Sequence, residues 1–344
     1  MKTKNKKTPD LQTLFELANH YPSPHNGQPI VLKQINDTTI DLYFQKERGL
    51  QAVDISLLFS YVTMGVFTRH FLLCAQALGH QMTYKLALPK IETIKGTGEV
   101  KFARYHLGYN QSAPDEDLRR MILFRQTSRK KYYEGLNDTL SQKTIDAAHK
   151  KGMQLVKMSQ HDAHQAIWLN QRAVFDDMFD SSVRHELNHW LRYNQAEKEA
   201  KMDGLSYDCM ELNGSTMKFL VKHYRLLRWP GISSVLKKYY LRTMSDNSDV
   251  YYMLAPFSNE QESFNVGLEI MNIWAMIARE GYYLHPFGTI MSNVDAHQDF
   301  LKLASITNED IHKNFLIFIY RAGKSEEPNQ SLRIPIEQHL IKRN

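Results

Sequence analysis

The sequence predicts an α+β fold made of two related halves. Helical and strand patterns are mixed along all 344 residues. One layout also occurs twice: a helix, a polar or basic loop, a strand or hairpin, and a long helix. The two long helices end in similar segments, AQALG at 75–79 and AREG at 278–281. We therefore expect a first half at 1–115 and a second half at 116–344.

Each predicted element of the first half follows from its local pattern. Apolar residues at helical spacing predict helices, and short runs rich in β-branched and aromatic residues predict strands. The glycine at position 79 favours the left-handed conformation in which helices commonly end. The predicted elements are a helix at 11–21, a hairpin at 31–46 with its turn at 36–38, a buried helix at 55–79, and strands at 82–89 and 99–108.

The second half repeats these patterns and also contains an inserted helical segment near 203–247. The insert carries clustered Lys and Arg with Tyr, Trp and Leu, and it is broken at WPG (229–231). A lid over a ligand, a segment on a membrane surface and a plain helical hairpin all fit this composition. The other predicted elements are helices at 116–124, 141–151, 161–180 and 262–280, and strands at 153–158, 250–257 and 314–323.

Composition favours a globular chain that binds a small anion rather than nucleic acid. Hydrophobic residues make up 42% of the chain, and the net charge of +6 is mild and dispersed. Two cysteines indicate neither a disulfide framework nor a thiolate metal site, which fits a reducing compartment. The apolar stretch at 56–78 is interrupted by Arg69 and His70, and the N-terminal residues lack the apolar core of a signal peptide. We expect a cytoplasmic protein without stable membrane insertion.

One short motif indicates a different chemistry. His185-Glu186-Leu-Asn-His189 matches the H-E-x-x-H pattern of zinc peptidases, in which two histidines one helical turn apart hold the metal. Zinc needs a third protein ligand, but Arg192 and Gln195 occupy the places where the extended motif has glycine and histidine. An ordinary amphipathic helix is the simpler interpretation, so no metal is expected and a zinc hydrolase is a distant alternative.

Two polar clusters are stronger candidates for a site, and the first is the loop PSPHNGQP (22–29). Three prolines stiffen this loop. A stiff loop can present polar groups to a planar heterocycle with little loss of conformational entropy, although a plain polar turn has the same composition. The candidate binding residues are Pro22, Ser23, His25, Asn26 and Gln28.

The second cluster is Arg125-Gln-Thr127-Ser-Arg129. Two arginines four positions apart on a helical turn would direct both guanidinium groups the same way, and the hydroxyl groups between them add donors. This set suits a phosphate group. A solvated basic face, continued by Lys130 and Lys131, is the alternative.

Together the clusters resemble motifs of the FMN-dependent nitroreductase family, specifically its long members with two fused nitroreductase-like halves. In that family an R-x-[ST]-x-R segment holds the FMN phosphate and ribityl chain, and a P-S-x-x-N-x-Q-P-W segment of the partner half covers the flavin. The first segment is matched by Arg125, Thr127 and Arg129. The second is matched by Pro22, Ser23, Asn26, Gln28 and Pro29.

The resemblance extends over most of the chain. PNQSLRIP (328–335) is similar to the C-terminal K-x-R-x-P element, whose arginine, here Arg333, reaches the phosphate. Ile30 stands where the family has Trp, and Ser331 stands where it has Lys, so three arginines remain for the phosphate. The segments that resemble the long core helices of the two halves are 54–79 and 267–288.

The resemblance implies a nitroreductase-like fold in which the two halves form an intramolecular pseudo-dimer with one flavin site between them. It implies FMN as the cofactor, NAD(P)H as the hydride donor, and a nitroaromatic or quinone as the small-molecule acceptor. Gly288 is the candidate catalytic residue, because a backbone N–H near the second core helix donates to flavin N5 in the family.

Two other functions stay open at this point. A protein that stores FMN with little turnover would also combine weakened motifs with a lid, and the zinc hydrolase remains the distant alternative. We expect no nucleic-acid partner. Association of two pseudo-dimers into a homodimer is left open.

Overall fold

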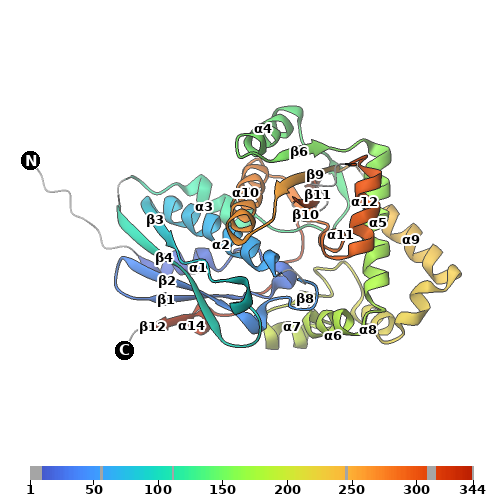
Figure 1. The fold of residues 1–344 in the computed structure, drawn as a ribbon, viewed down its shortest axis with the longest axis horizontal. Coiled ribbons are helices and arrows are strands. Elements are labelled where there is room, and N and C mark those ends of the chain that lie inside the picture. Colours follow the sequence, from blue (N-terminus) through green and yellow to red (C-terminus); the bar gives the residue numbers. More distant parts are fainter. Residues whose placement is uncertain (1–9, 55–56, 111, 245–246, 308–314, 343–344) are drawn as a thin grey trace, which may run out of the picture.

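The computed structural model describes residues 10–54, 57–110, 112–244, 247–307 and 315–342. Within this part of the chain, helices and strands are mixed as the sequence predicts. The strands form two main sheets, and two long helices lie between them (Figure 1). Five residues of predicted elements, at positions 55, 56, 245, 246 and 314, lie outside the described residues.

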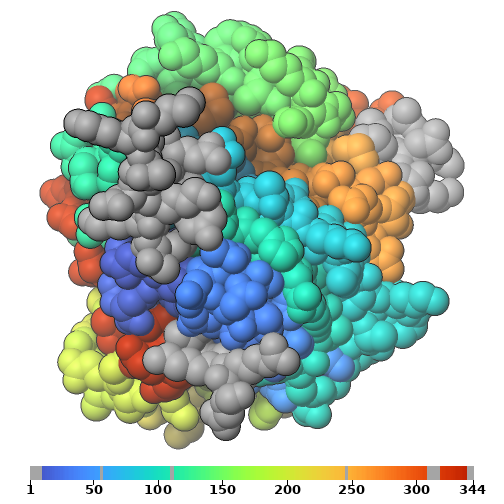
Figure 2. All heavy atoms as spheres, turned by 90° about the vertical axis from the view of Figure 1, so that its left-hand side faces the viewer, coloured from blue at the N-terminus to red at the C-terminus, as the bar shows by residue number. Residues whose placement is uncertain are grey.

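The first sheet comes mainly from the N-terminal part of the chain. Its order is β12-β1-β2-β4-β3, and all neighbours are antiparallel except β12, which runs parallel to β1. The predicted hairpin and both predicted strands are confirmed. On the surface, C-terminal residues in red lie beside N-terminal residues in blue (Figure 2). The strands are β1 Ile30–Gln34, β2 Thr39–Gln45, β3 His80–Leu86, β4 Glu99–Asn110 and β12 Leu340–Lys342.

The second sheet repeats the order of the first. Its strands run β6-β9-β11-β10, every neighbouring pair is antiparallel, and a short strand β5 adds to β11. In chain order, β6, β9, β10 and β11 thus occupy the positions that β1, β2, β3 and β4 have in the first sheet. The strands are β5 Tyr132–Glu134, β6 Gln154–Lys157, β9 Asp249–Pro256, β10 Tyr283–Pro286 and β11 Phe315–Ser325.

Two helices of 20 residues each, α2 (Leu58–Ala77) and α10 (Glu260–Arg279), cross between the sheets. A Cβ added at Gly65 would lie 2.0 Å from the carbonyl oxygen of Phe264, and one added at Gly267 would lie 2.1 Å from that of Val62. Each helix therefore contributes a glycine at the point where the other approaches. Both predicted helices are confirmed, and both are followed by a glycine with positive φ, at positions 79 and 281.

The main core fills the space between these helices and the sheets. It includes Phe71, Tyr105 and Phe264, which are fully buried and pack edge to face or tilted against aromatic neighbours. α2 is the one helix among the described residues that is long and apolar enough to cross a membrane. However, 78% of its apolar window is buried within the protein, as expected for a core helix.

The remaining helices cover the edges of the molecule and enclose a second, smaller core. There α5 packs on β9, and α9 and α12 pack on α5; residues such as Ile167, Phe300 and Ile319 belong to this core. The α-helices are α1 Leu11–Ala18, α3 Glu116–Phe124, α4 Asp138–His149, α5 Gln160–Asp177, α6 Ser181–Trp190, α7 Gln195–Lys201, α8 Gly214–Lys222, α9 Pro230–Met244, α11 Gly288–Ser292, α12 Val294–Leu303 and α14 Ile336–His339. The 3-10 turns are η1 Pro24–Asn26, η2 Lys46–Arg48, η3 Ile91–Thr93 and η4 Tyr224–Arg228, and a minor sheet pairs β7 Leu191–Arg192 with β8 Leu205–Ser206.

Candidate functional site

A pocket of about 830 Å³ gathers residues from segments that are far apart in the sequence. Its walls come from the proline-rich loop, α2, the segment after α3, α5, α6, the inserted segment, the start of α11 and the C-terminal segment. Of the predicted site residues, those that line it are Pro22, Ser23, His25, Asn26, Arg125, Thr127, Arg129, Gly288 and Arg333. Gln28 does not line the pocket.

The proline-rich loop is held in an unusual backbone conformation. His25, Asn26 and Gln28 have φ values of 50°, 52° and 52°, although none of them is glycine. Such conformations are uncommon for residues with a side chain, and they persist where surrounding contacts enforce them. The Ser23 hydroxyl accepts a 3.0 Å hydrogen bond from the Gln28 backbone N–H, and Ile30 N–H donates to the Tyr21 hydroxyl at 3.1 Å.

Gln28 fixes this loop to the rest of the protein. Its side chain is fully buried, its amide nitrogen donates to the Met202 carbonyl at 2.9 Å, and its amide oxygen accepts from Ile334 N–H at 2.9 Å. The sequence predicts Gln28 as a cofactor-binding residue. In the structure its amide nitrogen and oxygen are hydrogen-bonded to main-chain atoms. Gln28 therefore supports the loop and does not contact a ligand in the pocket.

Asn26 lines the pocket but is also bonded to the C-terminal segment. Its amide nitrogen donates to the Leu332 carbonyl at 3.1 Å, and its amide oxygen accepts a hydrogen bond from Arg333 Nη1. Asn26 therefore orients the guanidinium group of Arg333 toward the pocket. The pairing joins two parts of the chain about three hundred residues apart.

Three arginines approach the pocket from different segments. Arg125 is 4% exposed, donates to the His20 carbonyl at 2.6 Å and lies over the Trp274 ring at 4.9 Å. Arg129 donates to the Cys209 carbonyl at 3.2 Å. Burial lowers the pKa of each of the three, to about 9 for Arg125, where the charge of Arg333 adds to the effect. Arg125 therefore remains charged at neutral pH, and Arg129 and Arg333 are charged because the guanidinium group does not lose its proton in proteins.

These arginines have no acidic partner among the described residues. Within the part of the chain that the structure describes, no carboxylate lies within ion-pair distance of Arg125, Arg129 or Arg333. The Nε atoms of Arg125 and Arg333 are buried without any hydrogen-bond acceptor there. Buried charges in proteins are normally paired, so this group of cations is suited to an anion that enters the pocket.

The segment that carries Arg125 and Arg129 is not the helical turn that the sequence predicts. α3 ends at Phe124, Arg125 leaves the helical region with ψ of 109°, and Thr127 forms a parallel bridge with Leu284. Extended chain alternates its side chains from one face to the other. Arg125, Thr127 and Arg129 therefore share a face because they are two positions apart, rather than because the arginines are four apart.

The pocket histidines are neutral at physiological pH. Burial and the nearby charge of Arg129 lower the pKa of His25 to about 4. Burial, followed by the charges of Arg129 and Arg321, places the pKa of His285 well below its ordinary value. Arg321 Nε donates to His285 Nδ1 at 3.3 Å, so the proton of neutral His285 resides on Nε2. The positive charge at the pocket therefore comes from the arginines.

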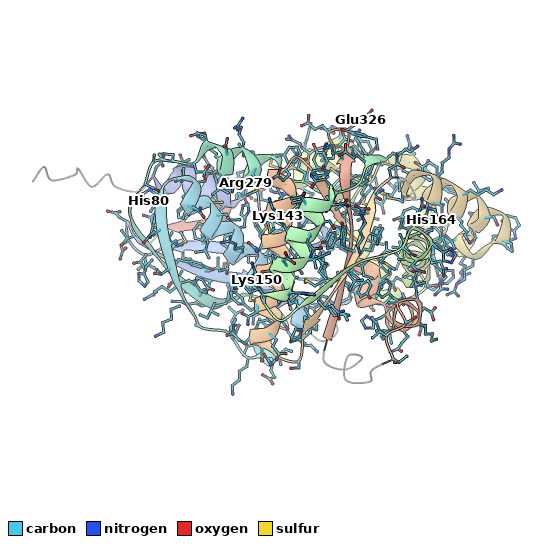
Figure 3. The ribbon with its side chains drawn as sticks, turned by 90° about the horizontal axis from the view of Figure 1, so that it is seen from above. His80, Lys143, Lys150, His164, Arg279 and Glu326 are labelled. Carbon is cyan, nitrogen blue, oxygen red and sulfur yellow. The ribbon has the colours of Figure 1, made fainter. Side chains whose placement is uncertain are left out.

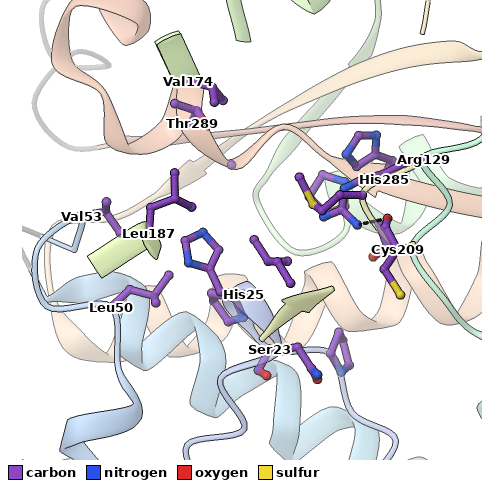
Figure 4. A pocket seen from close by; sticks show the side chains of 18 of the residues that line it. Ser23, His25, Leu50, Val53, Arg129, Val174, Leu187, Cys209, His285 and Thr289 are labelled. Atoms are coloured by element: carbon purple, nitrogen blue, oxygen red, sulfur yellow. Dashed lines mark hydrogen bonds between the residues drawn. The ribbon is translucent and has the colours of Figure 1, made fainter. Parts of the chain in front are cut away.

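The two sides of the pocket differ in polarity. Figure 4 shows Arg129, His285 and Cys209 grouped on one side and Leu50, Val53 and Leu187 on the other. His25 lies between these groups, and its Nδ1 is buried without a partner among the described residues. An elongated ligand with an anionic end and a largely apolar body fits this arrangement.

Sequence analysis missed Trp274 and His285. Trp274 lies on α10 two turns after Gly267, so helical spacing places it on the α2 side, but nothing in the local sequence associates it with Arg125. His285 lies in the short strand β10, and only its pairing with Arg321 of β11 makes it part of the site.

The His-Glu-x-x-His segment lies on α6, and that predicted helix is confirmed. Both oxygens of Glu186 accept backbone hydrogen bonds, from Ala52 N–H at 3.0 Å and Val53 N–H at 3.2 Å. The His189 ring packs edge-on against Trp190. No group of three or more His, Cys, Asp or Glu that could hold a metal ion occurs among the described residues.

Comparisons with known proteins found a similarity in structure but none in sequence families or curated proteins. No protein-family model matches the chain, and no curated protein does. Among solved structures, it is similar to the FMN-dependent nitroreductase NfnB from Mycobacterium smegmatis in complex with NADPH. The sequence identity is 11%, the TM-score is 0.41, and the match covers 65% of this chain and 96% of that chain.

Proposed function

We propose that the pocket binds FMN and that the protein passes hydride from NAD(P)H to an electron-poor acceptor of the nitroaromatic or quinone type. The observation that carries this proposal is the convergence of Arg125, Arg129 and Arg333 on one pocket. Each belongs to a motif that resembles a phosphate-binding element of the nitroreductase family. That these arginines, up to about two hundred residues apart in the sequence, line the same pocket is a separate observation that does not depend on the resemblance.

The residues present fit the phosphate of FMN. A phosphate would supply the negative charge that pairs with these arginines. Its oxygens would accept hydrogen bonds from the unused Nε atoms of Arg125 and Arg333. The Thr127 side chain lies on the same face and adds a hydroxyl donor. Neutral His285 offers its Nε2 proton and His25 its unpartnered Nδ1 to polar atoms farther along the ligand.

The redox chemistry would come from FMN when it is bound, namely hydride transfer from NAD(P)H to an electron-poor acceptor. The chain contributes binding, orientation and electrostatics. The three arginines stabilise negative charge near the ligand, and the backbone N–H of Gly288, at the pocket wall, is the proposed donor to the flavin ring. With His25 neutral, protons come from water.

We further propose that the halves 1–115 and 116–344 form an intramolecular pseudo-dimer of nitroreductase-like fold. Three features support this: the repeated strand order of the two sheets, the reciprocal glycines where α2 and α10 cross, and the addition of β12 to the first sheet. A reciprocal contact of this kind is typical of a two-fold interface. One chain would then hold one FMN, in the cytoplasm, with a small molecule as its partner.

A protein that stores FMN with little turnover is the second candidate. The inserted segment lines the pocket along much of its length and could restrict access by a second substrate. The two functions differ in one measurable property, which is whether NAD(P)H reduces the bound flavin.

The test is reconstitution of the purified protein with FMN. We expect oxidised-flavin absorbance bands that NAD(P)H bleaches and that menadione or a nitroaromatic restores. Stable bands without bleaching would favour storage. Failure to bind any flavin, with one zinc per chain and peptide hydrolysis that His185→Ala abolishes, would overturn the proposal.

A further inference from the structure

The inserted segment presents two faces with different chemistry. Met217, Leu220 and Val221 of α8 line the pocket, and so do Leu236 and Tyr240 of α9. These positions recur at the three- and four-residue spacing of one helix face. The residues of the inner face therefore serve to line the pocket, whereas those of the outer face have no such role.

The outer face combines cations with exposed apolar side chains. On α9, Val235, Lys238 and Arg242 are exposed at a spacing of three and four residues. On α8, Lys218 and Lys222 are exposed on either side of Phe219. In Figure 1, α9 lies at the right-hand edge of the molecule, on the side away from the first sheet.

The charge of this segment is of one sign. Residues 214–244 contain seven Lys and Arg and no Asp or Glu. All seven are exposed, and Arg228 lies 3.3 Å from Asp176. Among the described residues, the cations that form no ion pair with an acidic side chain are Lys218, Lys222, Arg225, Lys237, Lys238 and Arg242.

Exposed hydrophobic side chains concentrate in the same segment. It holds four of the seven large hydrophobic residues that are most exposed in the described part of the chain. Trp229 is 65% exposed and Val235 is 66% exposed, while Phe219 and Tyr239 are each 51% exposed; Tyr239 also lines the pocket, so it lies at the border of the two faces. Trp229 stands immediately before α9, at the break predicted for this segment.

We propose that residues 214–244 bind reversibly to the surface of membranes that contain anionic phospholipids. Lys and Arg attract anionic headgroups, and exposed Trp, Phe and Val enter the boundary between headgroups and acyl chains. Phe219, Trp229 and Tyr239 are aromatic and could also stack on nucleobases, whereas the aliphatic Val235 could not, so binding to single-stranded nucleic acid is the alternative that the test must separate from lipid binding. α9 has 15 residues and is too short to span the bilayer, so the segment lies on the surface.

The probe is vesicles of phosphatidylcholine with or without phosphatidylglycerol, used with the full chain in a flotation assay. We expect binding only to vesicles with phosphatidylglycerol, and loss of that binding in high salt because screening shortens the reach of the charges. Lys238→Gln combined with Arg242→Gln should weaken partitioning roughly 20- to 30-fold, since each cation near such a surface contributes about fivefold. Trp229→Ala should abolish the blue shift of tryptophan emission on binding.

The matched control combines Lys143→Gln on α4 with Lys150→Gln at the C-terminal end of that helix, which removes the same charge from a different face (Figure 3). This control variant should bind vesicles like the wild type. Equal weakening by both double variants would show a non-specific effect of net charge and overturn the proposal. So would salt-sensitive binding to a single-stranded RNA without binding to vesicles. Thermal unfolding of each variant checks that the fold is intact.

Discussion

At the scale of single residues, the site depends on keeping arginines charged and histidines neutral in the same buried region. His25, His70 and His285 all have pKa values lowered chiefly by burial, to about 4 for His25 and about 3 for His70. Arg125 keeps its charge because its pKa stays at about 9. An anionic ligand is thus attracted by fixed charges that do not vary over the physiological pH range.

This arrangement predicts a specific pH dependence of stability. A histidine buried in its neutral form stabilises the fold above its unfolded pKa of about 6.5, and that stability is lost as the pH falls toward about 4. Asp54 has the opposite effect on stability, because burial raises its pKa to about 6 and the folded protein therefore binds a proton there as the pH falls. Urea unfolding of wild type and His25→Gln between pH 7 and 4.5 should diverge in favour of the variant by on the order of 1 kcal/mol per pH unit. Parallel profiles would show that His25 is not buried in its neutral form.

The hydrogen bond between Asn26 and Arg333 predicts non-additive losses of FMN affinity. Arg333→Ala and Asn26→Ala should each cost about 1.5–3 kcal/mol, because the first removes a cation and the second releases it from its orientation. The double variant should lose little more than Arg333→Ala alone, since both changes remove one unit. Asn26→Ala with Arg129→Ala is the control pair, with no bond between its members, and its losses should add. The affinities are measured by fluorescence titration. Additive losses in both pairs would show that Asn26 does not orient Arg333.

At the scale of secondary structure elements, local sequence predicts most of the described fold. α2, α3, α10 and the hairpin β1–β2 follow from apolar periodicity and turn residues, which are local properties. The segment from Arg125 to Arg129 was wrongly predicted as a helical turn. Its extended form depends on the bridge between Thr127 and Leu284, a contact across the fold that no local pattern reports.

The crossing of α2 and α10 predicts that Gly65 cannot be replaced. A Cβ in Gly65→Ala would meet backbone atoms of Phe264, Gly267 and Leu268 at 3.0 Å or less, so the helices must separate. We expect a loss of roughly 1–3 kcal/mol or more in free energy of unfolding, measured with urea. Gly231→Ala on α9 is the control, because a Cβ there meets nothing within 4 Å and helix propensity favours alanine by up to about 1 kcal/mol. Equal stability of wild type and Gly65→Ala would contradict the close crossing.

At the scale of the whole molecule, the sequence indicated a repeated layout, but it did not indicate the contacts between distant segments. The similar helix ends at Gly79 and Gly281 indicated a repeat, and the two sheets have the same strand order. The sequence did not predict that β12 pairs with β1, because a three-residue strand carries little pattern. Nor did it predict that Asn26 would hold Arg333, since their meeting depends on the path of the entire chain.

The central claim is that one pocket per chain holds the phosphate of FMN with these arginines. Its most direct test is a pair of titrations, with FMN and with riboflavin, of dilute wild-type protein and Arg125→Ala. We predict one FMN per chain and a loss of roughly 10- to 100-fold in FMN affinity in the variant, because charge-assisted bonds to phosphate are removed. Riboflavin, which has no phosphate, should lose much less. Equal losses for the two ligands would contradict the claim, because Arg125 would then act through the fold and not through the phosphate.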